Sequence, residues 1–251
     1  MGTRRLKSRR TQLRTIARGV AGAATVSVFL MIAAGVLSSL RRPRARHSGL
    51  GTAFSRPALL PLYGAVVSSL VIGGLRLWRP LPLRLSSRAE RAATLGGLAL
   101  LLPGTALTFW GRVRLGRMWD LSSSLGATVY ADHRLVTCGP FARVRHPIYL
   151  GWFLLAVGDV LVFRNWSAVF LLGSVPSMLL RSWREEQVLA DQFGEAWTAY
   201  RRAVPAWIPR LRRTAFVARR GDKAQSLDAR ATPGTMTPWA SAQAFVDAPE
   251  G

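Results

Sequence analysis

Residues 145–186 read RHPIYLGWFLLAVGDVLVFRNWSAVFLLGSVPSMLLRSWREE, a long apolar run with charged groups at both ends. A helix that crosses a membrane needs roughly 20 consecutive apolar residues. The run 148–180 is too long for one such helix, and the polar pair Arg164-Asn165 divides it. We therefore expect two helices of about 16 residues each, which form a tight or tilted hairpin.

Three further runs without any charged residue precede this hairpin. Gly19–Leu40, Pro57–Leu75 and Ala92–Gly111 contain 22, 19 and 20 residues. Each is long enough to cross about 30 Å of hydrocarbon. The sequence therefore predicts an all-α integral membrane protein with about five hydrophobic helices, the last two forming the hairpin.

The first run resembles a signal peptide only in its basic flank. It is longer than a typical signal-peptide core, and Arg41-Arg42 follows it like a stop-transfer flank. We therefore divide the chain into a basic N-terminal tail (1–15), a membrane domain (16–210) and a disordered C-terminal tail (211–251). Within the membrane domain, residues 115–209 form the catalytic part.

The charge of the chain is strongly positive, with 35 Lys and Arg against 12 Asp and Glu. We expect this basicity to face anionic lipid headgroups and not nucleic acid, because no basic stretch interleaves with aromatics on a soluble fold. A single cysteine, Cys138, excludes an intramolecular disulfide and a cysteine-based metal cluster. The three histidines lack metal-ligand spacing, so we expect no metal site.

Lys and Arg are retained on the cytoplasmic side of membrane proteins, so their distribution predicts orientation. With the N-terminus outside, the inner loops contain about twice as many basic residues as the outer ones. The basic segment before the first run favours the opposite orientation. We adopt a cytoplasmic C-terminal half in a bacterial-type inner (plasma) membrane.

The first end of the hairpin gathers residues that suit ligand binding. Pro147 fits the first turn of a helix, which places Arg145 and His146 at the helix N-terminus. Unpaired N–H groups and the positive end of the dipole attract an anion there. Tyr149 lies three residues after His146, on the same helical face.

The other end of the hairpin carries two adjacent carboxylates, Glu185 and Glu186. Such a pair is costly at a membrane interface unless it binds something cationic. Arg181 lies four residues before Glu185, at a spacing that permits a helical ion pair. If the hairpin folds back, the two ends form one pocket with acidic and basic walls.

Together, these pieces resemble the isoprenylcysteine carboxyl methyltransferase family and its phospholipid N-methyltransferase relatives. The resemblance covers about residues 115–209 and is carried, in order, by Leu115–Trp119, Gly139–Phe141, Arg145–Tyr149, Glu185-Glu186, Phe193-Gly194-(x)₅-Tyr200 and Ile208-Pro209. It implies a membrane-embedded methyltransferase with a cytoplasmic site. The cofactor would be S-adenosylmethionine, enclosed by the C-terminal segments.

The resemblance also assigns roles to individual residues. The cofactor would contact Arg145, His146, Pro147 and Tyr149, while Glu185 and Glu186 would hold its amino and ribose groups. Arg181, near the acceptor, and Glu185 would be the catalytic residues. The sequence departs from the family at Phe141, where Tyr is usual, and at Asp120, where Ser often follows the tryptophan.

The resemblance makes a lipophilic carboxylate of the isoprenylcysteine type the expected acceptor, and membrane lipids or lipidated substrates the expected partners. An aminophospholipid or a small thiol is the alternative, and for an amine Glu185, Glu186 or His146 would be the base. Membrane sterol reductases, which use NADPH, share a similar His-Pro-x-Tyr segment, but there Asn usually precedes the tyrosine and here Ile148 does. A non-enzymatic membrane subunit is a further alternative. The sequence leaves the oligomeric state open.

Two other expectations concern the hairpin. Asp159 lies in an apolar stretch, five residues before Arg164, and we expect these two side chains to pair. Trp152, Trp166 and Trp183 have the character of anchors at the membrane interface.

Overall fold

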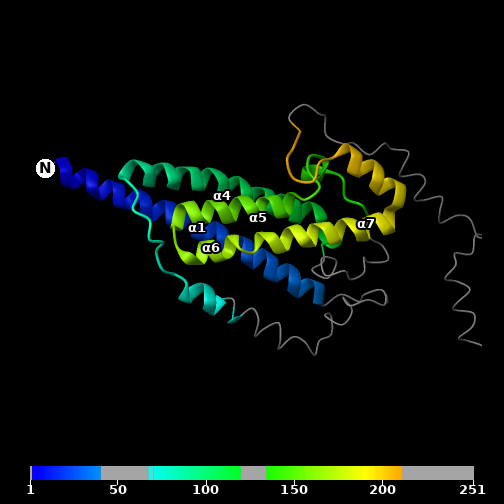
Figure 1. The fold of residues 1–251 in the computed structure, drawn as a ribbon, viewed down its shortest axis with the longest axis horizontal. Helices are drawn as coiled ribbons and strands as arrows, with labels where there is room; N and C mark the ends of the chain where they lie inside the picture. Colours follow the sequence, from blue (N-terminus) through cyan, green and yellow to red (C-terminus); the bar gives the residue numbers. More distant parts are fainter. Residues whose placement is uncertain (1, 41–67, 70, 120–133, 211–251) are drawn as a thin grey trace, which may run out of the picture. The chain divides into compact units, whose positions relative to one another are not determined.

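The computed structural model describes residues 2–40, 68–69, 71–119 and 134–210, and the regular elements in these ranges are helices (Figure 1). No strand occurs in these ranges; Pro80 and Asn165 form an isolated antiparallel bridge. The expected all-helical class is therefore confirmed over the described part of the chain. Its elements are α1 (Gly2–Leu40), α4 (Ser87–Leu115), η2 (Gly116–Met118), η4 (Gly139–Ala142), α5 (Pro147–Phe163), α6 (Trp166–Leu172) and α7 (Val175–Ala203).

Two of these helices are long and apolar enough to cross a membrane. They are α1, over Thr11–Gly35, and α4, over its full length of 29 residues. Because α1 begins at Gly2, the segment that we separated as a basic tail is continuous with the first helix. The expected span 57–75 and the tail 211–251 lie mostly or wholly outside the described residues, so the count of five helices stays a prediction.

The expected hairpin turn lies between α5 and α6. Arg164 ends α5 in the left-handed conformation (φ 50°, ψ 47°), and its N–H donates to the Val160 carbonyl at 3.0 Å. Asn165 begins α6, because its side-chain oxygen accepts the Ala168 N–H at 2.9 Å. This N-cap bond satisfies a backbone donor that the new helix would otherwise leave unpaired.

The second half of the expected hairpin differs from the prediction. A single helix was expected from residue 166 to 180, but α6 ends at Leu172 and α7 begins at Val175. The break follows from Pro176, which has no N–H to donate and whose ring would clash with the Leu172 carbonyl in a continuous helix. α7 then continues to Ala203 and bends at Gly194 (φ 48°, ψ −116°), a conformation that only glycine adopts readily.

Small residues bring α4 and α5 into close antiparallel contact. A Cβ atom on Gly97 of α4 would lie 2.8 Å from the Gly158 carbonyl oxygen of α5, and one on Gly104 would lie 2.6 Å from the Gly151 oxygen. No side chain fits at such distances. Close approach of two backbones over small residues is the common packing mode of helices in membranes.

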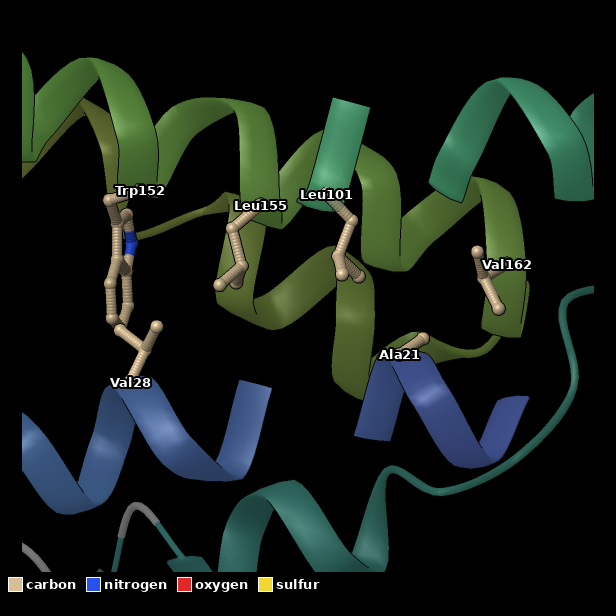
Figure 2. Close-up of a cluster of buried hydrophobic side chains, with 6 residues drawn as sticks. All are labelled: Ala21, Val28, Leu101, Trp152, Leu155 and Val162. Carbon is tan, nitrogen blue, oxygen red and sulfur yellow. The ribbon is translucent and has the colours of Figure 1, made fainter. Parts of the chain in front are cut away.

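The core lies between α1, α4 and α5 (Figure 2). Its buried members are Ala21 and Val28 of α1, Leu101 of α4, and Trp152, Leu155 and Val162 of α5. Trp152, expected at the membrane interface, is only 6% exposed, and its Nε1–H donates to Ser174 Oγ at 3.0 Å. That expectation is wrong for Trp152, because this tryptophan faces α1. Trp166 and Trp183 are exposed.

Charged residues link the helices at the end of the bundle where α5 turns into α6. Glu90 of α4 lies 3.3 Å from Arg164 and also binds Arg14 of α1. The expected pairing of Asp159 with Arg164 is therefore wrong. The Arg164 side chain reaches Glu90 of α4. The Asp159 carboxylate instead accepts a hydrogen bond from the Thr25 hydroxyl of α1, whose oxygen lies 3.0 Å from Oδ1 and 2.9 Å from Oδ2.

Candidate functional site

The site lies at the end of the bundle opposite Glu90, where α5 begins. Pro147 occupies the first turn of α5, as expected. The segment after α7 lies against this start, because the Arg145 N–H donates to the Pro205 carbonyl at 2.9 Å and the His146 N–H to the Ala206 carbonyl at 3.1 Å. These two N–H groups therefore pair the residues before α5 with the segment after α7.

The Arg145 side chain joins three parts of the chain. Its Nε and Nη2 donate to Glu186 Oε1 at 3.0 and 2.8 Å. Its Nη1 donates to the carbonyl oxygens of Arg201 at 3.1 Å and Val204 at 2.7 Å. The guanidinium also lies 5.9 Å from the centre of the Trp197 ring. Arg145 thus holds α7 and the segment after it against the start of α5.

Glu186 is the centre of this network. Its Oε1 also lies 2.9 Å from His146 Nε2, and its Oε2 lies 3.8 Å from Arg201 Nε. Burial acts to raise the pKa of Glu186, but the hydrogen bonds from His146 and Arg145 and their charges outweigh it and lower this pKa to about 2. Glu186 is therefore ionised at neutral pH, and His146 donates from Nε2.

Tyr149 and Glu185 form the neighbouring pair. The Tyr149 hydroxyl donates to Glu185 Oε2 at 3.1 Å. The Tyr149 ring stacks on the His146 ring, with centroids 5.7 Å apart, and the Trp207 ring lies 5.4 Å from His146 and 6.4 Å from Tyr149. The residues proposed from both ends of the hairpin, 145–149 and 185–186, are thus in direct contact.

One cavity of about 160 Å³ opens beside these residues. Of the seven candidate site residues, six line it, namely Arg145, His146, Pro147, Tyr149, Arg181 and Glu185. Glu186 is not among the lining residues, because its carboxylate is turned to Arg145 and His146. Ionisable side chains in the wall are four arginines, Arg112, Arg134, Arg145 and Arg181, with His146 and a single carboxylate, Glu185.

Two other motif pieces support the walls of the cavity. Tyr200, which is 2% exposed, donates its hydroxyl to the Phe141 carbonyl at 2.7 Å and so ties η4 to α7. Burial raises the pKa of Tyr200 above its usual value, so the hydroxyl stays a donor. The bend at Gly194 lies six residues before Tyr200 and turns the last part of α7 toward η4.

Residues 115–119 form a further wall. The Arg112 guanidinium lies 4.9 Å from the centre of the Trp119 ring, and its Nη1 donates to the Gly116 carbonyl at 2.9 Å. The Trp119 ring lies against Gly35 of α1, where a Cβ atom would come within 2.6 Å of it. This contact joins the end of α1 to the site.

Sequence reasoning missed several residues of the site. Met31 and Ile32 line the cavity from α1, far from every motif. Arg112 and Arg134 contributed to the sequence prediction only through the count of basic loop residues, and Trp207, which directly precedes the Ile208-Pro209 motif, was not predicted. Arg112 and Arg134 lie in the polar stretch between the apolar runs 92–111 and 148–180, and the charged residues of this stretch could have indicated them. Nothing in the sequence indicated Met31 and Ile32.

The described residues contain no group of three or more His, Cys, Asp or Glu side chains that could hold a metal ion. His47 and His133 lie outside the described residues, and Cys138 is exposed.

Comparison with known proteins gives relatives of one kind. Residues 97–191 match the model of the isoprenylcysteine carboxyl methyltransferase family. A protein-S-isoprenylcysteine O-methyltransferase of Schizosaccharomyces pombe is 39% identical over 80 residues, which are 31% of this chain and 34% of that protein. The human protein of the same name is 33% identical over 117 residues, 44% of this chain and 41% of that protein.

The mouse protein of that name is 31% identical over 103 residues, 39% of this chain and 36% of that protein. In all three comparisons the similarity therefore spans well under two thirds of the relative. The matched segment contains α5, most of α4 and the part of α7 with Glu185 and Glu186. The resemblance seen in the motifs is thus confirmed, and residues 97–191 carry the sequence pattern of the isoprenylcysteine carboxyl methyltransferase family.

Proposed function

We propose that this protein is a membrane-embedded methyltransferase that transfers a methyl group from S-adenosylmethionine to the carboxylate of a prenylated cysteine. The observation that carries the proposal is the convergence of Tyr149, Arg181 and Glu185 on one cavity whose wall also contains apolar side chains, among them Met31, Ile32, Trp152 and Met178. An acceptor with a charged head and a lipid tail matches such a wall.

The charge of the cavity favours a carboxylate acceptor over an amine. Glu186 and Arg145 neutralise each other, so the wall retains one carboxylate in the described part of the chain, Glu185, against three arginines, Arg112, Arg134 and Arg181. A positive wall attracts an anion and repels a protonated amine. An α-carboxyl group, with a pKa of about 3.5, is already ionised at neutral pH and needs no base.

The residues present also fit the methyl donor, which carries both cationic and polar groups. Glu185 accepts one hydrogen bond from Tyr149 and retains acceptor capacity on its other oxygen for a cationic group. The stacked rings of His146, Tyr149 and Trp207 offer aromatic surface beside it. When bound, S-adenosylmethionine supplies an activated methyl group.

The protein's contribution is then alignment and exclusion of water. Arg181 pairs with the acceptor carboxylate and orients it. Arg145 and Glu186 fix His146 and the start of α5 by the bonds described above, so that the wall is formed before either ligand binds. Trp119, packed on Gly35, closes the end of the site.

We further propose that the chain is inserted in a bacterial-type inner membrane with this site facing the cytoplasm. Two helices long and apolar enough to cross support insertion. Because Arg14 and Arg164 meet Glu90 at one end and the cavity lies at the other, the start of α1 and the site belong to opposite sides. With the site on the cytoplasmic side and the N-terminus outside, the inner loops would contain about twice as many basic residues as the outer ones, which supports this orientation. Lipidated substrates and anionic headgroups are the expected partners.

The test is binding of the donor to purified protein in detergent, measured by calorimetry. We expect S-adenosylmethionine to bind the wild type and to bind Glu185→Gln at least tenfold more weakly, an effect of about 1.4 kcal/mol for a lost charged contact. Glu195→Gln, an exposed acid on the same helix, is the matched control and should bind like the wild type. Equal binding by both variants would overturn the site.

The same measurement separates the other candidate class. A sterol-type reductase would bind NADPH, and we expect none. NADPH binding without S-adenosylmethionine binding would replace the methyltransferase with a reductase. Binding of neither cofactor would favour a non-enzymatic subunit.

A further inference from the structure

The cavity has an apolar side that comes partly from α1, a helix outside the matched residues 97–191. Met31 and Ile32 of α1 line it, together with Trp152 of α5 and Met178 of α7. The two methionines and Ile32 are partly buried and pack against the core cluster that contains Trp152. The apolar side is thus continuous with the protein core.

The inner boundary of this side is rigid. The Trp152 indole donates to Ser174 at 3.0 Å, and its ring meets the Phe29 ring edge to face, with centroids 5.2 Å apart. Val28, which is fully buried, lies against the same ring (Figure 2). A ring held by a hydrogen bond and by neighbours on another helix does not move aside for a ligand.

The two methionines that line this part of the cavity are more flexible than the Trp152 ring. Met31 and Met178 are unbranched side chains with several rotatable bonds, which reshape around an apolar ligand. The polar lining residues Arg181 and Glu185 follow Met178 by about one and two turns along α7, so the polar part of the wall lies farther along this helix. Apolar surface exposed in a cavity gains free energy when an apolar ligand covers it.

We propose that Met31 and Ile32 of α1 bind the isoprenoid tail of the acceptor and, with Trp152 as the fixed boundary, set the tail length that the enzyme accepts. This inference rests on the proposed function and adds to it the part of the chain that selects the substrate. Arg181 holds the carboxylate, and the tail extends from it along α1.

Substitutions at Met31 and Ile32 should change the preferred tail length in opposite directions. Met31→Trp fills the space, and we expect it to lower kcat/KM for a geranylgeranylated N-acetylcysteine about tenfold more than for the shorter farnesylated one, because added bulk in an apolar pocket discriminates by about this factor. The loss appears in KM. Ile32→Ala enlarges the space and shifts the preference toward the longer tail.

The matched control is Leu30→Trp. Leu30 neighbours Met31 on α1, but its side chain is 65% exposed and does not line the cavity. We expect Leu30→Trp to leave the ratio of the two kcat/KM values unchanged. Binding of S-adenosylmethionine should be the same in all three variants and the wild type, which also checks that each variant is folded.

The outcomes distinguish failure of this inference from failure of the proposed function on which it rests. If the wild type methylates both acceptors but Met31→Trp and Ile32→Ala leave their ratio unchanged, the role of α1 is overturned and the proposed function stands. If Leu30→Trp shifts the ratio as much as Met31→Trp, the selection does not arise from the cavity. If the wild type methylates neither acceptor, the proposed function fails and the inference with it.

Discussion

At the scale of single residues, the site is organised around Glu186. Adjacent carboxylates suggested that Glu185 and Glu186 share one task, namely holding the cofactor. In the structure they have different neighbours, because consecutive helical residues point in directions about 100° apart. Glu185 faces Tyr149 and the cavity, while Glu186 faces Arg145 and His146. Glu186 therefore does not line the cavity but holds Arg145 and His146, which do.

Replacing Glu186 by Gln should destabilise the protein. The change removes the charge that pairs with Arg145 and His146 in a partly buried network, which costs about 2 kcal/mol. Thermal unfolding in detergent measures the loss. Glu195→Gln removes an exposed acid from the same helix and should change stability by less than about 0.5 kcal/mol. Equal unfolding temperatures for the two variants would contradict this role.

The same residue predicts how stability depends on pH. The pKa of Glu186 falls from 4.5 to about 2 in the folded protein, so the folded state binds this proton less tightly than the unfolded state. Its contribution is therefore fully present above pH 4.5 and is lost as the pH falls toward 2.

Unfolding of the wild type and of Glu186→Gln, followed from pH 6 to pH 3, checks this dependence. We expect the difference in unfolding temperature to shrink on acidification. A constant difference would show that the Glu186 carboxylate is not held in its charged form.

At the scale of elements, close packing of small residues holds α4 against α5. Gly97 and Gly96 are neighbours on α4, but only Gly97 faces α5. A Cβ on Gly97 would lie 2.8 Å from both the Gly158 oxygen and Val162 Cγ2, whereas a Cβ on Gly96 meets nothing within 4 Å.

Gly97→Ala should therefore force the helices apart and cost about 2 kcal/mol, the usual penalty for overpacking. Gly96→Ala should stabilise the helix by roughly 0.5 kcal/mol, because glycine loses more conformational entropy on folding than alanine. Thermal unfolding of both variants decides the matter. If both substitutions stabilise the protein, the close packing of α4 on α5 is wrong.

Prediction from the sequence worked best where local signals are strong. Pro147 marked the start of α5, and Arg164-Asn165 marked its end, because proline geometry and N-capping act within a few residues. The break before Val175 was not predicted, although Pro176 is a strong helix-breaking signal. The length of the apolar run 166–180 favoured one continuous helix over a break at this proline.

Long-range contacts were harder to predict. The pairing of Asp159 with Arg164 was inferred from proximity in sequence, but Thr25 and Glu90 lie more than 70 positions away from their partners. No local pattern identifies such partners. The same limit explains why the cavity residues on α1 were missed while the motif residues of the C-terminal half were identified.

At the scale of the whole molecule, the two ends of the bundle differ in chemistry. One end joins Arg14, Glu90 and Arg164 by ion pairs. The other contains the cavity, where Arg145 and Glu185 lie in the wall. If the bundle crosses a membrane, these ends face opposite compartments.

Reporter fusions test this arrangement. A reporter that is active only in the cytoplasm should be active when it follows Arg210, and inactive when it precedes Gly2. The physical reason for this orientation is that it gives the cytoplasmic loops about twice as many basic residues as the outer loops. Activity at both positions, or at the N-terminal position alone, would contradict a cytoplasmic site.

The most direct test of the proposed activity is methyl transfer from S-adenosylmethionine labelled in its methyl group to a farnesylated N-acetylcysteine. A carboxyl methyl ester is hydrolysed by base and releases labelled methanol, whereas a methyl group on nitrogen or sulfur stays attached. We predict base-labile label with the wild type and with Arg184→Gln, an exposed arginine on α7. With Arg181→Gln, kcat/KM should fall by about a hundredfold, the scale of one lost charged contact. Base-stable label, or no transfer by protein that binds the donor, would contradict carboxyl methylation.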